Sequence, residues 1–221
     1  MYVACANLHC SALSKDAKTC LDLEAEIVTT ASFPAKELGE VLALECDVAI
    51  PAQVKAAIEA VDARFGRVDA LVNVPFLFPA RVAPHELPLE AWNAALAVNL
   101  TGHFLCCQAA MAGMKRLQFG RIINLGSVVG KNSGNARPWI NPDEQAVAGN
   151  LAYGASKAGV HMLTGFLARE LAAHGITVNA LAPGPIATGM TTGFPPALRA
   201  LIPRGRMGTP DDVAQIGRAH V

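Results

Sequence analysis

The sequence has no excess of charge of either sign, because 18 Lys and Arg residues balance 18 Asp and Glu residues in a chain of 221 residues. This balance removes the electrostatic case for binding nucleic acid or an anionic membrane surface. Polar or charged residues interrupt every apolar run well before the roughly 20 residues that a membrane-spanning helix needs. The N-terminus also lacks a basic region followed by a long apolar core. We therefore expect neither nucleic acid nor a membrane as a partner.

The cysteines show no Cys-x-x-Cys spacing, and no histidine pair completes a zinc template. The six residues are Cys5, Cys10, Cys20, Cys46, Cys106 and Cys107. We predict reduced thiols, a cytoplasmic location and no metal site. The length, and the absence of any linker-like or low-complexity stretch, predict a single domain over residues 1–221 with one sizeable core.

From Val41 onward, short apolar runs alternate with stretches of helical periodicity. The runs at 41–48, 68–74, 120–130 and 176–184 predict strands, and the stretches at 51–66, 89–116 and about 152–174 predict helices. Strands that alternate with crossover helices form a mostly parallel sheet with helices on both faces. Ligands of such sheets bind at the carboxyl ends of the strands, where Asp47, Asn73, Ser127 and the Pro183-Gly184 pair fall.

The stretch LAYGASKAGV, residues 151–160, places Tyr153 and Lys157 four positions apart within a predicted helix. Residues at this spacing share one face of a helix. In one interpretation, the tyrosine packs beside a solvated lysine. In the other, the ammonium group lowers the pKa of the phenol, ordinarily about 10, and makes the tyrosine a usable proton donor.

Five motifs decide between these interpretations. They are ECDV (45–48), AVNL (97–100), INLGSVVG (123–130), YGASK (153–157) and APGPIATGM (182–190). In this order they resemble the adenine-side aspartate, the catalytic asparagine, the serine strand, the Tyr-x-x-x-Lys motif and the nicotinamide-side turn of the short-chain dehydrogenase/reductase family. The resemblance covers roughly residues 41–215. It implies an α/β fold, a Rossmann-like doubly wound sheet.

The resemblance also implies roles for four catalytic residues. Tyr153 would protonate a carbonyl oxygen as hydride arrives from a nicotinamide, and Ser127 would hydrogen-bond the same oxygen. Lys157 would lower the pKa of the tyrosine and hold the nicotinamide ribose. Asn99 would anchor a water that links the lysine to solvent. Without the resemblance, Asn99 would be interpreted as a polar helix residue that faces a neighbouring loop. Ser127 would be interpreted as a residue at the end of a strand whose hydroxyl hydrogen-bonds within a turn.

By the same resemblance, NAD or NADP would contact Asp47, Val48, Asn73, Tyr153, Lys157, Pro183, Gly184, Ile186 and Thr188. Asp47 would accept from the adenine amino group, beside the Val48 backbone. Ile186 and Thr188 would hold the carboxamide and phosphate side. His103 and His161 have no carboxylate or cysteine partners in the sequence, so we expect them to be interfacial or exposed rather than catalytic.

The chain departs from the family pattern at its beginning. The family opens with a strand and a glycine-rich turn at a helix N-terminus, whereas Gly39 is the only glycine before Val41. Residues 1–7 and 26–32 are alternative candidates for the family's second strand. In LVNVPF (71–76), bulky residues follow Asn73 where the family has Asn-Asn-Ala-Gly, so we expect poorer or rearranged cofactor binding. The residues leave the choice between NAD and NADP open.

We also expect the last strand of the family's sheet to be absent. IGRAHV (216–221) back-translates to the start of a common sequencing adapter, so we expect a truncated, marginally stable chain of weak or no activity. The family's first strand lies between its second and fourth strands, so its loss should leave two strand edges unpaired.

Two loops point to the substrate. The polar loop at 130–150, with Arg137 and Trp139, is a candidate substrate wall or a plain surface excursion. The segment 191–208 resembles the family's lid and is most similar to that of 3-oxoacyl-acyl-carrier-protein reductases. The resemblance therefore implies a carbonyl or alcohol substrate, which acyl carrier protein could carry, and a homodimer or homotetramer. The alternative is an inactive fragment that acts as an oligomerisation or binding module through its long helices.

Overall fold

The computed structural model describes residues 2–5, 42–79, 82–133 and 151–218. The chain divides into two compact units. The first comprises Met1–Asn7 and Cys46–Ala182, and the second comprises Leu8–Glu45 and Pro183–Val221. All four predicted catalytic residues belong to the first unit. The single domain over 1–221 stays a prediction, as does the role of Arg137 and Trp139, which lie outside the described residues.

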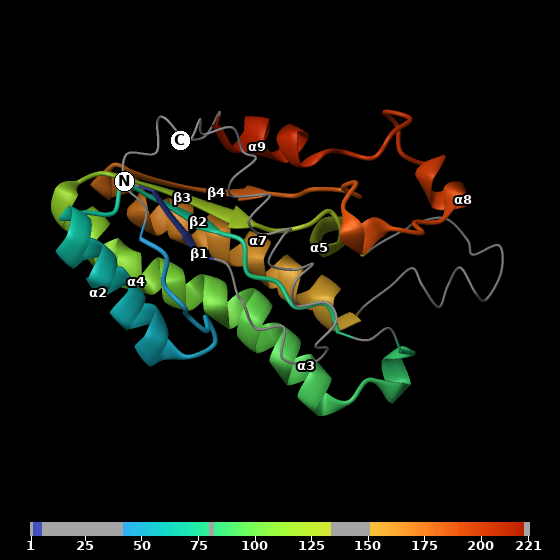
Figure 1. The fold of residues 1–221 in the computed structure, drawn as a ribbon, viewed down its shortest axis with the longest axis horizontal. Coiled ribbons are helices and arrows are strands. Elements are labelled where there is room, and N and C mark those ends of the chain that lie inside the picture. Colours follow the sequence, from blue (N-terminus) through green and yellow to red (C-terminus); the bar gives the residue numbers. More distant parts are fainter. Residues whose placement is uncertain (1, 6–41, 80–81, 134–150, 219–221) are drawn as a thin grey trace. The chain divides into compact units, whose positions relative to one another are not determined.

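The sheet of the first unit has four parallel strands in the order β1-β2-β3-β4 (Figure 1). The strands are β1 (Tyr2–Cys5), β2 (Ala70–Asn73), β3 (Gly120–Leu125) and β4 (Ile176–Leu181). Asn73 pairs in register with Asn124, so β2 and β3 reach their carboxyl ends together. Three predicted strands are confirmed, because the runs at 68–74, 120–130 and 176–184 contain β2, β3 and β4.

The predicted strand at 41–48 is wrong. Residues 42–47 have no regular structure, and Leu42 and Leu44 are 38% and 41% exposed. An apolar run becomes a strand only where a neighbouring strand accepts and donates its backbone hydrogen bonds. Among the described residues, no strand is paired with this run.

The N-terminal segment forms a strand directly beside β2, with Ala4 in register with Val72. The sequence predicts an open edge at this position, but β2 is paired on both sides by β1 and β3. Of the two candidate segments for the family's second strand, residues 1–7 therefore contain a strand, and residues 26–32 lie outside the described part of the chain.

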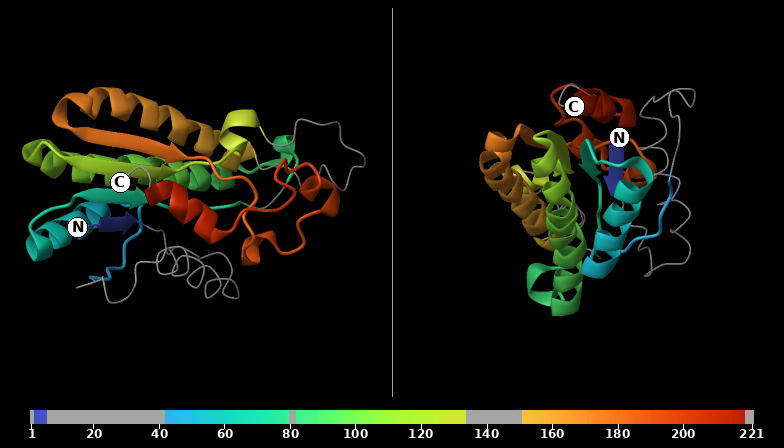
Figure 2. Two further views of the ribbon diagram at one scale, coloured as in Figure 1. Left: turned by 90° about the horizontal axis from the view of Figure 1, so that it is seen from above. Right: turned by 90° about the vertical axis from the view of Figure 1, so that its left-hand side faces the viewer.

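The predicted helices are confirmed. They are α2 (Pro51–Phe65), a continuous stretch of α3 (Leu89–Leu96), a π-helical segment (Ala97–Thr101) and α4 (Gly102–Leu117), and α7 (Leu151–Leu171). Pro51 begins α2 at a position where a backbone N–H would have no partner within the helix, so the proline costs no hydrogen bond. Gly66 ends the helix in the left-handed region at φ +79°. In Figures 1 and 2, α2, α4 and α7 lie side by side on one face of the sheet. The described residues of this unit contain no helix on the other face, where the sequence predicts a second layer.

The core lies between the sheet and these helices. It contains Leu71 and Ile122 from the strands, Cys106 and Met114 from α4, and Leu171 from α7, all fully buried. Val48 also enters it, because Gly102 leaves room: a Cβ on Gly102 would lie 2.7 Å from Val48 Cγ2. Residues 89–117 are apolar and long enough to cross a membrane by length and composition. The inner side of this stretch is buried in the core, which accounts for its apolar character.

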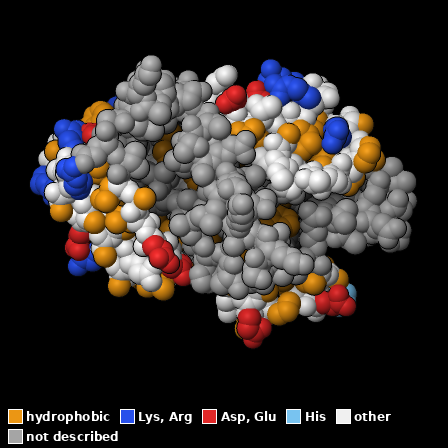
Figure 3. Space-filling model, viewed as in Figure 1, with side chains coloured by type: hydrophobic (Ala, Val, Ile, Leu, Met, Phe, Trp, Pro, Cys, Tyr) orange, Lys and Arg blue, Asp and Glu red, His pale blue; other side chains and the backbone are white. Residues whose placement is uncertain are grey.

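The second unit contains short elements among its described residues. They are a 3₁₀ turn (Gly189–Thr191), α8 (Pro196–Arg199) and α9 (Pro210–Arg218). A parallel bridge joins Ile186 to Gly208, and Arg206 forms an ion pair with Asp212 at 2.7 Å. On the face drawn in Figure 3, the described basic and acidic side chains occur in small scattered groups.

Candidate active site

Ser127 follows β3 in a turn that is anchored on two sides. The Gly126 N–H donates to the Leu181 carbonyl of β4 at 2.8 Å, and the Gly130 N–H donates to the Ser127 carbonyl at 3.1 Å. The Ser127 side chain accepts a hydrogen bond from the Val129 N–H at 3.2 Å, at the start of the short helix α5 (Val129–Asn132). The hydroxyl is therefore held at the carboxyl end of the sheet, the edge at which parallel sheets bind ligands.

Tyr153 and Lys157 lie in the first two turns of α7, and α5 packs directly on this part of the helix. The approach is close because residue 130 is glycine: a Cβ there would lie 2.6 Å from the backbone of Lys157. This packing brings the Ser127 hydroxyl into a hydrogen bond with the Tyr153 phenol. The bond stabilises the phenolate form of Tyr153. The structure thus brings together three of the four predicted catalytic residues.

Lys157 is buried, with only 1% of its surface exposed. Its Nζ donates to the Leu125 carbonyl at 2.7 Å and to the Pro75 carbonyl at 3.4 Å, and lies 5.8 Å from the centre of the Tyr153 ring. Burial lowers the pKa of this lysine from 10.5 to about 7. The ammonium group can therefore release its proton near neutral pH.

The expected lowering of the Tyr153 pKa is wrong for this structure. Burial raises the pKa of the phenol above 10.0, and the hydrogen bond with Ser127 offsets only part of the rise. The Phe78 ring contributes to this burial, since its centre lies 4.9 Å from that of Tyr153 at an angle of 53°. Sequence spacing places the ammonium group near the phenol, but it does not show how much water the fold removes.

Asn99 lies in the π-helical segment, where the Gly102 N–H bonds to the Ala97 carbonyl five residues earlier. Its side chain is fully buried and makes two hydrogen bonds to the backbone of Leu77. The Leu77 N–H donates to Oδ1, and Nδ2 donates to the Leu77 carbonyl at 2.8 Å. Nδ2 also reaches Ser156 Oγ at 3.1 Å. Asn99 thus fixes the segment that carries Phe78. Its predicted role in holding a water stays a prediction.

Asn73 is fully buried, and its side chain points into the core rather than toward a ligand surface. Its Nδ2 donates to Asn124 Oδ1 at 2.9 Å and lies 3.3 Å from Cys107 Sγ, and Asn124 in turn donates to Thr164 Oγ1 at 3.0 Å. This chain of amides links β2, β3, α4 and α7. The Asn73 Nδ2 is therefore engaged in the core while its Oδ1 has no hydrogen-bond partner, and the predicted cofactor contact of Asn73 stays a prediction.

Asp47 and Val48 precede α2. The Asp47 carboxylate accepts a hydrogen bond from the Ala49 N–H at 2.9 Å, and the Asp47 N–H donates to Gln53 Oε1 at 2.7 Å. This local turn positions the start of α2. The Val48 side chain is in the core, as described above, so its predicted cofactor contact concerns the backbone alone. Both adenine contacts stay predictions.

The four predicted residues after β4 belong to the second unit. Gly184 is exposed, and a Cβ there would meet no atom within 4 Å. Thr188 begins the 3₁₀ turn and shares a capping box with Thr191, whose hydroxyl also donates to the Ile186 carbonyl at 2.6 Å. Pro183 and Ile186 are half-buried. These contacts order the segment locally, and the roles of these residues toward a cofactor stay predictions.

The expectation of an interfacial or exposed position is wrong for His103, whereas His161 is partly buried. His103 lies on the buried side of α4, and neither ring nitrogen makes a hydrogen bond of normal geometry. Burial lowers its pKa well below 6.5, and the nearby charge of Lys157 acts in the same direction. His161 lies against the Ser127 turn. Its position eight residues after Tyr153, on the same helical face, is the sequence signal that could have found it.

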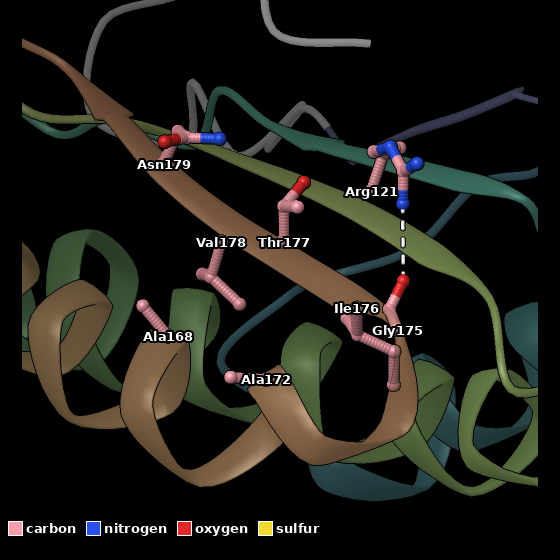
Figure 4. Close-up of a pocket in the computed structure, with 8 residues that line it drawn as sticks. All are labelled: Arg121, Ala168, Ala172, Gly175, Ile176, Thr177, Val178 and Asn179. Carbon is pink, nitrogen blue, oxygen red and sulfur yellow. Dashed lines mark hydrogen bonds between the residues drawn. The ribbon is translucent and has the colours of Figure 1, made fainter.

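A pocket of about 390 Å³ lies along β4 (Figure 4). It is lined by Arg121, Ala168, Ala172 and residues 175–179, and Arg121 donates to the Gly175 carbonyl at 3.1 Å. Ala168 is fifteen residues beyond Tyr153 on α7, which corresponds to about 22 Å along a helix. The pocket is therefore remote from the Ser127, Tyr153 and Lys157 group.

A family model described as enoyl-(acyl carrier protein) reductase matches residues 17–218. The chain belongs to the short-chain dehydrogenase/reductase family. It is 39% identical to the 3-oxoacyl-[acyl-carrier-protein] reductase of Synechocystis sp. over 80% of this chain and 66% of that enzyme. It is 39% identical to the D-threitol dehydrogenase of Mycolicibacterium smegmatis over 76% of this chain and 62% of that enzyme. The chain thus spans somewhat less than two thirds of these two relatives.

Another member of the family, the 3-oxoacyl-[acyl-carrier-protein] reductase FabG of Salmonella typhimurium, is 34% identical over 90% of this chain and 80% of that enzyme. The crystal structure of gox2181 superposes with a TM-score of 0.73 at 30% identity, covering 98% of this chain and 77% of that chain. Sequence and structure therefore agree on the family and on its Rossmann-like fold.

Proposed function

We propose that the protein is an NAD(P)(H)-dependent oxidoreductase that interconverts a ketone and a secondary alcohol. The observation that carries the proposal is the hydrogen bond between the Ser127 hydroxyl and the Tyr153 phenol, with the Lys157 ammonium group one helical turn away. Two hydroxyl groups that converge at the carboxyl end of a parallel sheet are suited to hold one carbonyl oxygen. Membership of the family supports this chemistry.

The donor set fits the nicotinamide end of a dinucleotide. An ammonium group has three N–H donors, and Lys157 uses two of them on the carbonyls of Leu125 and Pro75. The third is available for a ribose hydroxyl. When bound, the nicotinamide supplies or accepts the hydride. The residues support NAD and NADP equally.

In the reductive direction, the substrate oxygen accepts a hydrogen bond from the Ser127 hydroxyl. Tyr153 then gives its proton to that oxygen as negative charge develops on it. The resulting phenolate regains a proton from Lys157. This transfer is energetically downhill, because the pKa of the lysine is about 7 whereas that of the buried phenol is above 10.0.

We propose a 3-oxoacyl thioester, including one linked to acyl carrier protein, as the substrate class. Two of the relatives named above are 3-oxoacyl-[acyl-carrier-protein] reductases. A third relative, 37% identical over 87% of this chain and 74% of its own length, is a (2S)-[(R)-hydroxy(phenyl)methyl]succinyl-CoA dehydrogenase of Thauera aromatica, whose name also describes a thioester.

Oxidation of NADPH or NADH by the purified protein with acetoacetyl-coenzyme A tests this proposal. We expect turnover by the wild type and loss of at least about a hundredfold in Ser127→Ala, the magnitude that removal of one oxyanion donor produces. Equal rates for the two proteins, or turnover with neither cofactor, would contradict it.

A second candidate function is a binding module without catalysis. Met162 and Phe166 lie one turn apart on α7 and are 63% and 67% exposed, and Phe104 on α4 is 39% exposed. Such apolar side chains on adjacent long helices suit a homodimer or homotetramer. Sedimentation of the wild type and of Phe166→Lys tests the assembly. Unchanged NADH fluorescence on addition of protein, together with a stable oligomer, would favour this candidate over the enzyme.

A further inference from the structure

His161 is the third polar residue on the face of α7 that carries the catalytic pair. Tyr153, Lys157 and His161 follow one another at intervals of four residues, so their side chains project from the same side of the helix. The first two reach the Ser127 hydroxyl and the end of β3. The third reaches the backbone of the same turn: His161 Nε2 lies 2.9 Å from the Ser127 carbonyl oxygen and 3.4 Å from its nitrogen.

One ring nitrogen cannot donate to the carbonyl and accept from the N–H at the same time. The shorter distance is to the carbonyl oxygen, so the geometry places a proton on Nε2 and makes His161 the donor. The Ser127 carbonyl then accepts two hydrogen bonds, one from the Gly130 N–H at 3.1 Å and one from the imidazole. Two acceptor sites on the oxygen are thereby satisfied.

The packing around this bond leaves the ring little freedom. A Cβ added to Gly126 would lie 2.7 Å from His161 Nε2 and 3.0 Å from the Leu181 carbonyl oxygen. The imidazole thus occupies the space next to Gly126 that a side chain there would need. Glycine at residue 126 therefore allows α7 to approach the end of β3, and the His161 ring occupies the space between them.

We propose that His161 is a positioning residue that fixes Ser127 relative to Tyr153, by donating a hydrogen bond from Nε2 to the Ser127 carbonyl. The turn around Ser127 is held by β4 through Gly126 and by α5 through Gly130. His161 adds the side-chain hydrogen bond from α7, the helix that carries the phenol. Movements of α7 and of the Ser127 hydroxyl are therefore coupled. The distance between the Ser127 hydroxyl and the Tyr153 phenol, the two groups that hold the substrate oxygen, stays constant.

This inference rests on the proposed function, and two substitutions test it. His161→Leu keeps the approximate size of the ring and removes the donor, whereas His161→Gln keeps a donor. We expect His161→Leu to lower kcat for reduction of acetoacetyl-coenzyme A by about tenfold to a hundredfold, since small misplacements of a catalytic group cost this much. The KM for NADPH should stay unchanged, and His161→Gln should recover most of the loss. His85→Leu, which removes an exposed histidine, is the control.

A double-mutant cycle separates positioning of Ser127 from a general structural role. If His161 acts through Ser127, His161→Leu should have little further effect in a Ser127→Ala background. If His161→Leu lowered kcat by the same factor in the wild-type and Ser127→Ala backgrounds, the proposal would be overturned. Failure of His161→Gln to recover kcat would also overturn it.

A wild type that does not reduce ketones would defeat the proposed function, and the contact would then be tested by NMR. The amide resonances of Ser127 and Gly130 should shift in His161→Leu and remain near their wild-type positions in His161→Gln. Wild-type positions in both variants would show that the hydrogen bond does not order the turn.

Discussion

Lys157→Met should remove most of the dependence of protein stability on alkaline pH. In the folded protein the pKa of Lys157 is about 7, against an ordinary value of 10.5. The folded state therefore loses this proton at a pH at which the unfolded state still holds it, so stability rises with pH through this window. At 1.36 kcal/mol per pKa unit, the full difference corresponds to about 5 kcal/mol.

Within an accessible range, from about pH 7 to about pH 9, the same pKa values give the wild type an increase of about 2 kcal/mol in the free energy of unfolding. Below about pH 7 both states are protonated and the cost of the buried charge is fully present. In Lys157→Met the increase should vanish, because methionine does not titrate. The variant also leaves the carbonyls of Leu125 and Pro75 without a donor, at a cost of about 1–3 kcal/mol that is independent of pH.

Urea unfolding followed by circular dichroism at several pH values gives the free energy of unfolding as a function of pH for the wild type and for Lys157→Met. Lys131→Met, which replaces an exposed lysine, should keep the wild-type slope and serves as the control. If wild type and Lys157→Met gained the same stability between these pH values, Lys157 would not be a buried group of lowered pKa, and the proton relay proposed for it would lose its basis.

Three further predictions concern the surroundings of the site. Gly130→Ala should push α5 away from α7 and reduce ketone reduction by more than tenfold, measured as kcat/KM, because its Cβ would lie 2.6 Å from the backbone of Lys157; wild-type activity would show that α5 is not in contact. His103→Leu should leave the free energy of unfolding unchanged or raise it by about 1–2 kcal/mol, since it removes an unpaired buried polar group. It should also abolish the loss of stability as pH falls below 6.5, a loss expected because the folded-state pKa of His103 is depressed. A destabilised variant in urea unfolding would contradict the first expectation, and an unchanged loss of stability below pH 6.5 would contradict the second. Finally, kcat/KM for ketone reduction should fall above about pH 7 as Lys157 loses its proton, and a flat profile up to about pH 9 would exclude that lysine as the proton source.

Local patterns in the sequence predict most elements of the first unit. The helical periodicity around Tyr153 and the apolar run before Ser127 each lie within one element, so they determine it without information from distant residues. Pairing between strands depends on partners far away in the chain. For this reason the apolar run at 41–48 is wrongly predicted as a strand, whereas the N-terminal residues Tyr2–Cys5 form one beside β2.

Spacing along α7 also predicts which catalytic side chains meet, but not their environment. Burial determines the direction in which the pKa of Tyr153 shifts. This burial results from the packing of distant segments such as the one that carries Phe78. His161 could have been found from its spacing. His103 could not, because a polar residue on the inner face of an apolar helix gives the same pattern whether it binds a ligand or is simply buried.

The rate of ketone reduction by Tyr153→Phe tests the central claim most directly, because this change removes the phenolic proton and leaves the ring that packs against Phe78. The measurement is a single-turnover assay with NADPH and acetoacetyl-coenzyme A, in which binding of the cofactor is checked separately by fluorescence. We expect cofactor binding to persist and the rate of hydride transfer to fall by about 10² to 10⁴, the contribution of a positioned general acid. A wild-type rate in Tyr153→Phe would show that the substrate oxygen receives its proton from another group.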